Sequence, residues 1–76
     1  MAVNWVARTK RGDYVRFESK PIYNEALDCW GSPNNLPCLL YREDEYPYPP
    51  ITFEESPKRI IFSHYPYFHF DKYSEE

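Results

Sequence analysis

Residues 3–18 read VNWVARTKRGDYVRFE, two runs of alternating side chains on either side of a single glycine. Side chains that alternate with a period of two lie on opposite faces of a β-strand. Gly12 stands between the runs, where a tight turn requires a positive φ that glycine adopts without strain. The stretch therefore predicts a β-hairpin formed by residues 3–9 and 13–18.

A short helix is expected next, over residues 22–30. Pro21 precedes this segment, and Gly31 stands where a helix commonly ends. The apolar residues fall on one helical stripe that we expect to pack on the sheet. The stripe consists of Ile22, Ala26, Cys29 and Trp30.

Further strands are expected in the second half of the chain, separated by proline-rich turns. Apolar residues indicate a buried strand at 38–42, a short edge strand at 51–53 and a strong strand at 59–63. Residues 64–70 are expected to continue extended. The polar tail, residues 71–76, is expected to fray.

Aromatic side chains make a core feasible in so short a chain. The sequence has 76 residues, of which 20% are aromatic. Each aromatic side chain buries about 150 to 250 Å², which offsets the small fraction of surface that a short chain can bury. We therefore predict a single domain over residues 1–76. Its predicted class is α+β, a small twisted antiparallel sheet of four to five strands with one short helix packed on it.

The location of the protein is predicted from apolar runs and cysteine content. No apolar run approaches the roughly 18 residues of a membrane-spanning helix, and residues 1–5 lack the pattern of a signal peptide. Cys29 and Cys38 are too few for the disulfide framework of a small secreted domain. We expect a cytoplasmic protein without membrane association, in which both cysteines are thiols.

The two cysteines and the two histidines, His64 and His69, are residue types that bind zinc. Cys29 and Cys38 lie too far apart in sequence for a structural zinc site, and strand positions five apart point to opposite faces, which separates the histidines. We expect no metal site and no cofactor. A disulfide between the two cysteines stays open, because it depends on an oxidising compartment.

The sequence contains none of the motifs that we associate with catalysis. Gly12 and Gly31 are its two glycines, so neither a phosphate-cradling loop nor a dinucleotide-binding fingerprint can be formed. The acidic residues near Glu43 and Glu54 lie in proline-flanked loops, where a solvated acidic face is the simpler interpretation. We predict that the chain is not an enzyme.

Charge is divided unevenly along the chain. Residues 1–20 carry five basic and two acidic side chains, whereas residues 21–76 carry four basic and ten acidic ones. The basic hairpin also holds Trp5, Tyr14 and Phe17, and single-stranded nucleic acids bind such mixtures of cations and rings. A pI of about 5.3 is low for this class of protein. One hypothesis is nonetheless a nucleic-acid-binding domain that uses Arg8, Lys10, Arg11 and Arg16.

The most unusual feature of the chain is an acidic, tyrosine-rich loop, Glu43-Asp44-Glu45-Tyr46-Pro47-Tyr48-Pro49-Pro50. Its prolines stiffen the backbone, and tyrosine is enriched at protein–protein interfaces. An alternative is that Tyr46 and Tyr48 fold back and cap the core. We predict that a protein partner with a basic surface contacts Glu43, Asp44, Glu45, Tyr46 and Tyr48.

The leading hypothesis is a non-enzymatic protein-binding module that occludes a basic surface of its partner. Small acidic proteins suit accessory or inhibitory roles, including those of bacteriophage proteins, although this expectation rests on size rather than on any residue. Nucleic-acid binding is the second hypothesis. A third is a structural component of a larger particle, in which aromatic edge strands over 59–70 pair with a neighbouring copy. The sequence leaves the oligomeric state open.

Overall fold

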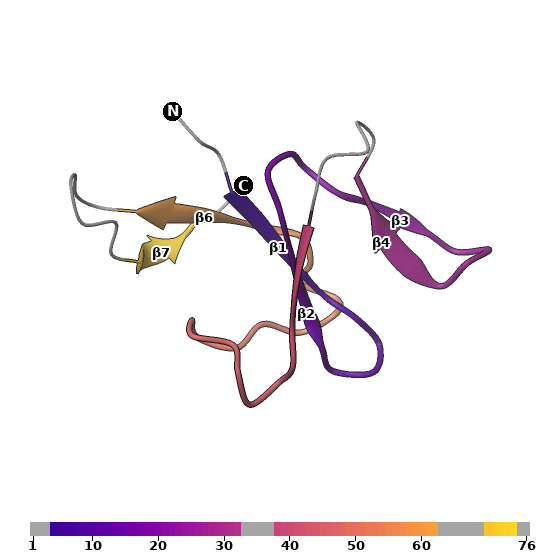
Figure 1. The fold of residues 1–76 in the computed structure, drawn as a ribbon. Coiled ribbons are helices and arrows are strands. Elements are labelled where there is room, and N and C mark those ends of the chain that lie inside the picture. Colours follow the sequence, from indigo (N-terminus) through magenta and orange to yellow (C-terminus); the bar gives the residue numbers. More distant parts are fainter. Residues whose placement is uncertain (1–3, 33–37, 63–69, 75–76) are drawn as a thin grey trace.

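The computed structural model describes residues 4–32, 38–62 and 70–74, and these fold into two antiparallel β-sheets (Figure 1). The larger sheet has five strands, in the order β5 (Cys38–Tyr41), β2 (Tyr14–Phe17), β1 (Asn4–Arg8), β6 (Lys58–Phe62) and β7 (Phe70–Tyr73). The smaller sheet is a hairpin of β3 (Ile22–Asn24) and β4 (Cys29–Gly31). No described residue belongs to a helix, so none forms one that could cross a bilayer.

The first hairpin is confirmed as β1 and β2. Arg8 lies opposite Tyr14 where the two strands approach the turn. The Thr9 amide donates to the Asp13 carbonyl at 2.8 Å and closes the turn. Gly12 has a φ of 104°, in the left-handed region that favours glycine. Both the hairpin and the role of its glycine therefore follow from local sequence.

The predicted helix over residues 22–30 is wrong, because this segment forms the β3–β4 hairpin. The Leu27 amide donates to the side-chain oxygen of Asn24 at 3.1 Å within the turn. Asp28 has a φ of 53°, a left-handed conformation that the interior of an α-helix does not contain. The predicted α+β class is therefore corrected to an all-β fold with two sheets.

Packing explains why a hairpin replaces the helix. Most of the predicted apolar stripe is exposed: Ile22 is 63% exposed, and Ala26 and Cys29 are also exposed. Trp30 is the residue that packs: its indole N–H donates to the carbonyl of Arg8 at 3.0 Å, and its ring contacts that of Tyr23 on the opposite strand. A helix of two turns makes few internal hydrogen bonds, so these tertiary contacts outweigh a weak helical pattern.

Expectations in the second half of the chain also fail, at residues 51–53 and in the tail. Residues 51–53 form no strand; Ile51 is buried, but the Thr52 amide donates to the Glu55 carboxylate at 2.9 Å in a turn. Side-chain bonds of this kind compete with strand pairing for the backbone donors. The tail that was expected to fray supplies residues 71–73 to β7.

The strands predicted at 38–42 and 59–63 are present as β5 and β6. β5 was expected to be buried, yet it lies at one edge of the larger sheet, where it pairs with β2. β6 lies between β1, which pairs with residues 58–60, and β7, which pairs with residues 60–62, so it is not an edge strand of the larger sheet. Residues 63–69 lie outside the described part of the chain.

The main core covers one face of the larger sheet, beneath the loop that joins β5 to β6. Val6 and Tyr14 are 0% and 1% exposed, and Ile51 from the loop and Ile60 from β6 are buried with them. Partly buried aromatic side chains surround this cluster: Tyr41, Tyr46, Tyr48, Phe62, Phe70 and Tyr73. The loop is therefore part of the core as well as of the surface.

Candidate binding surface

The acidic residues of the predicted contact set lie in a tight turn that directly follows β5. The amides of Glu45 and Tyr46 both donate to the Arg42 carbonyl, at 3.0 and 3.1 Å. The Glu45 carboxylate accepts from the Arg42 amide at 3.3 Å. All three side chains of this acidic turn, residues 43–45, are exposed.

The two tyrosines of the predicted contact set point inward. The rings of Tyr46 and Tyr14 are stacked with their centroids 3.8 Å apart, and the Tyr46 and Tyr73 hydroxyl oxygens are 2.7 Å apart. Burial, and then this hydrogen bond, raises the pKa of Tyr46 well above its ordinary value. Tyr48 stacks on Phe70 at a centroid distance of 4.9 Å. The tyrosines therefore cap the core, and the three acids remain the exposed part of the set.

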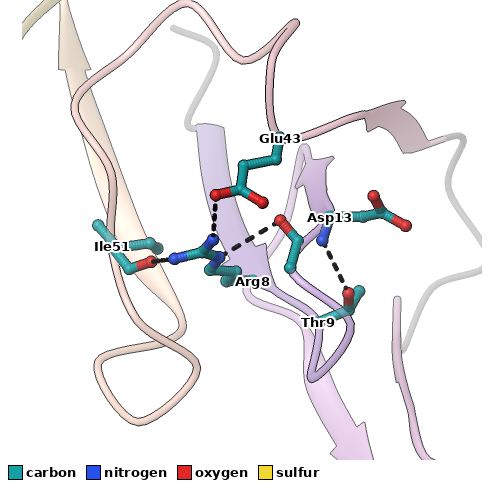
Figure 2. A network of polar contacts seen from close by, with 6 residues as sticks. Arg8, Thr9, Asp13, Glu43 and Ile51 are labelled. Atoms are coloured by element: carbon teal, nitrogen blue, oxygen red, sulfur yellow. Dashed lines mark hydrogen bonds and ion pairs between the residues drawn. The ribbon is translucent and has the colours of Figure 1, made fainter.

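Arg8 joins the acidic turn to the first hairpin (Figure 2). Its guanidinium lies 3.1 Å from the Glu43 carboxylate and donates to the carbonyls of Ile51 at 3.1 Å and Gly12 at 3.3 Å. The Arg8 side chain is 22% exposed and that of Glu43 is 71% exposed. Arg8 therefore anchors the β5–β6 loop, and one acid of the turn is already paired within the protein.

Two other cations of the predicted nucleic-acid surface are also engaged within the protein. The Lys10 ammonium lies 3.5 Å from the Asp28 carboxylate and 5.4 Å from the centroid of the Tyr23 ring. A hydrogen bond with Tyr23 and the charge of Asp28 raise the pKa of Lys10. The Arg16 guanidinium donates to the side-chain oxygen of Asn4 at 3.2 Å. Both cations therefore have partners that a phosphate would have to share or replace.

The aromatic rings of the first hairpin do not form an open stacking platform. Tyr14 and Phe17 are 1% and 2% exposed. Trp5 is half-buried, and the Lys20 ammonium lies 5.5 Å from its ring centroid. Arg11 is an exposed cation at the tip of the hairpin. Base stacking would therefore depend on rings that the fold uses for its own packing.

The exposed apolar edge of the larger sheet is a feature that the sequence did not predict. Among the described strands β5 pairs with β2 alone, and Leu39 and Leu40 are 57% and 69% exposed. Proteins commonly protect sheet edges with charged residues, and β7 at the opposite edge carries Asp71 and Lys72. The apolar run from Cys38 is typical of a buried strand, so the pattern itself contained no signal of its exposure.

A pocket open to solvent lies at the Cys38 end of β5, and the acidic turn lies at the other end of the strand. The lining residues come from β1, β2, β5 and the position after β2. They are Asn4, Arg16, Phe17, Glu18, Cys38 and Leu39. The pocket, β5 and the acidic turn follow one another along this edge of the larger sheet, and they are named here the β5 surface.

Among the residues that could bind zinc, the structure describes the two cysteines but not the two histidines. Cys29 and Cys38 are exposed free thiols. Among residues 4–32, 38–62 and 70–74, no group of three or more histidine, cysteine or acidic side chains could hold a metal ion. His64 and His69 lie outside these ranges, so the predicted lack of a zinc site stays a prediction.

No protein-family model, curated protein or solved structure matches this chain. The inhibitory and bacteriophage roles suggested by small size therefore have no support, and we do not retain them. The function has to be inferred from the geometry of the β5 surface.

Proposed function

We propose that this chain is a non-enzymatic protein-binding module and that the β5 surface is where its partner binds. The proposal depends on one observation, the exposure of Leu39 and Leu40 at 57% and 69% on an edge strand. Leu39 and Leu40 project from opposite faces of β5, and a partner that binds along this edge removes both side chains from water. The acidic turn beside them favours a partner with a basic surface.

The acidic turn supplies charge to this surface, and Asp44 is its most available member. Glu43 is paired with Arg8, and the Glu45 carboxylate accepts a hydrogen bond from the Arg42 amide. Asp44 is exposed between them. The proposed contact set is therefore Leu39, Leu40 and Asp44, with Tyr46 and Tyr48 supporting the loop from the core side.

The free thiols support binding in a reducing compartment such as the cytoplasm. Cys29 and Cys38 are both exposed and unbridged. Cys38 belongs to β5 itself, and an oxidising compartment would expose this thiol to disulfide formation. A cytoplasmic partner is therefore part of the proposal.

The test is a pull-down of the tagged protein from a lysate of its native cells, beside three variants. Asp44→Lys reverses a charge in the acidic turn, and Leu40→Lys places a charge on the apolar edge. Glu25→Lys makes the same charge change as Asp44→Lys in the exposed β3–β4 turn and serves as the control. We expect a protein partner that the first two variants lose and the control retains.

The purified partner should then bind Leu40→Lys about tenfold more weakly than the wild type, a loss of about 1.4 kcal/mol, and Asp44→Lys about threefold more weakly, as expected for an exposed charge contact. A partner that both variants retain would contradict the proposal. Recovery of nuclease-sensitive material, lost with Arg11→Ala and steeply weakened by salt, would support the nucleic-acid hypothesis instead.

A further inference from the structure

The hydrogen-bonding pattern of the larger sheet shows which backbone groups of β5 face away from β2, toward the open edge of the sheet. Along a strand of an antiparallel sheet, successive residues direct their N–H and C=O groups to opposite sides. The Arg8 amide donates to the Ser56 hydroxyl at 2.8 Å, and the Arg8 carbonyl accepts from the Trp30 indole at 3.0 Å. The backbone groups of Arg8 therefore face away from β2.

The strand register shows how this alternation of backbone directions continues from β1 through β2 to β5. Tyr14 lies opposite Arg8, so its backbone groups face away from β1 and toward β5. Tyr41 lies opposite Tyr14 and therefore directs its own backbone groups toward β2. Leu40, in the neighbouring position, directs its N–H and C=O to the open edge.

The open edge thus combines backbone and side-chain features that suit an added strand. Leu40 presents a donor and an acceptor that no described strand pairs, together with a side chain that is 69% exposed. Cys38, two residues earlier, presents its backbone groups on the same side. Such a row of outward groups is the template to which extended peptides add.

Building on the proposed function, we infer that the partner supplies an extended segment that pairs antiparallel with β5, with basic residues at its N-terminal end and alternating apolar residues after them. Every strand pair of the larger sheet is antiparallel, and antiparallel pairing is the more stable per residue. This direction brings the N-terminal end of the segment beside the acidic turn, where lysine or arginine complements Asp44. Its C-terminal end reaches the pocket at Cys38.

A second copy of this chain fits the edge less well than a partner segment. β5 has four residues, and two such strands bury far less than the roughly 1,200 Å² of a stable interface. Each copy also carries a net charge of −3, which adds repulsion between copies. A basic segment removes that repulsion and can bind with the modest affinity of a short strand.

The first experiment selects the partner segment without assuming its sequence. A displayed library of random peptides of about 12 residues, long enough for one strand, is selected against the intact protein after depletion against the Leu40→Pro variant. Proline removes the outward N–H of Leu40 and is tolerated on an edge strand where that N–H faces solvent. We expect enriched peptides that begin with lysine or arginine and continue with alternating apolar residues.

An enriched peptide is then synthesised, and its Kd is measured on the wild type and on three variants. Leu40→Pro should weaken binding about tenfold, because a backbone hydrogen bond is lost. Asp44→Lys should weaken it about threefold, as expected for an exposed charge contact. Glu25→Lys should leave the Kd unchanged, because the β3–β4 turn is not part of the β5 surface.

Amide hydrogen exchange gives a readout that needs no variant. In the free protein the Leu40 amide should exchange faster than the Leu39 amide, which faces β2. In the complex with the peptide the Leu40 amide should become protected, because it then donates to the added strand.

Strand addition would be overturned by a library that yields no enriched peptide, by equal binding to Leu40→Pro, or by an unprotected Leu40 amide in the complex. Dimerisation of the protein that Leu40→Pro abolishes would overturn it in favour of a second copy. The two proposals fail on different results. A cellular partner lost with Asp44→Lys and Leu40→Lys but retained with Leu40→Pro would keep the binding surface and reject the added strand, whereas a partner that Asp44→Lys and Leu40→Lys both retain would reject the proposed function.

Discussion

The ring of Tyr46 lies flat on the ring of Tyr14, with centroids 3.8 Å apart and planes inclined by 2°. Tyr14 belongs to β2, whereas Tyr46 comes directly after the acidic turn. Stacked aromatic rings add to the free energy that their burial already contributes. The contact therefore makes the loop a cover for the core and holds the acidic turn in place at the end of β5.

The ring of Tyr46 should contribute more to stability than its hydroxyl. Tyr46→Ala removes the stacked ring and should lower the free energy of unfolding by about 2 to 4 kcal/mol. Tyr46→Phe keeps the ring, loses the hydrogen bond to Tyr73 and should cost about 1 kcal/mol. Urea denaturation followed by circular dichroism measures both values. Equal losses for the two variants would show that the stack contributes nothing.

Stability should fall as the pH rises above about 10, the ordinary pKa of tyrosine. Burial raises the pKa of Tyr46 and of Tyr73 in the folded protein. Below the unfolded pKa both states keep these protons and the full stability is present; above it the unfolded chain releases protons that the folded protein retains. The free energy of unfolding should then drop by at most about 1.4 kcal/mol per pH unit for each tyrosine, less where solvent reaches the hydroxyl.

Urea denaturation between about pH 8 and pH 11 tests this dependence. Tyr46→Phe is the matched variant, because it removes one of the two hydroxyls and should show a shallower decline. Lysine titration affects the wild type and the variant alike, so the difference between them isolates Tyr46. If the free energy of unfolding declined equally with pH in the wild type and in Tyr46→Phe, Tyr46 would not contribute to the pH dependence.

Arg8 should be important for folding, whereas its ion pair with Glu43 should contribute little. Arg8→Met leaves the carbonyls of Gly12 and Ile51 without their donor and should cost about 2 to 4 kcal/mol. Glu43→Gln should cost less than about 1 kcal/mol, because the Glu43 side chain is 71% exposed. Arg42→Met, at an exposed position before the acidic turn, is the control for losing an arginine. If Glu43→Gln lowered the free energy of unfolding as much as Arg8→Met, the ion pair would contribute as much as the hydrogen bonds of Arg8, and this prediction would be wrong.

The two glycines should differ in their tolerance of alanine. A Cβ at Gly12 would lie 3.3 Å from the Glu43 carboxylate, and the φ of 104° strains any residue with a side chain. Gly12→Ala should therefore lower the free energy of unfolding by about 1 to 2 kcal/mol. A Cβ at Gly31 meets no atom within 4 Å, so Gly31→Ala should be neutral or slightly stabilising. Thermal denaturation of the two variants provides the comparison, and similar losses would show that Gly12 is not constrained.

The candidate site was only partly predictable from the sequence. The acidic turn was identified because three adjacent carboxylates in a proline-flanked loop favour solvent, and they are exposed. Tyr46 and Tyr48 could be assigned to a partner or to the core with equal reason, since tyrosine has both an apolar ring and a polar hydroxyl. Leu39 and Leu40 were assigned to a buried strand, because apolar residues do not themselves indicate which strand ends a sheet.

The sequence by itself determined the β1–β2 hairpin, because alternation along each strand and the positive φ at Gly12 are local properties. The tertiary structure decided the form of residues 22–30 and the exposure of β5. The first depends on the bond from Trp30 to the carbonyl of Arg8, which residues distant in sequence must make together. The second depends on strand order, since an edge exists only where no further strand pairs, and strand order is settled by the packing of the whole chain.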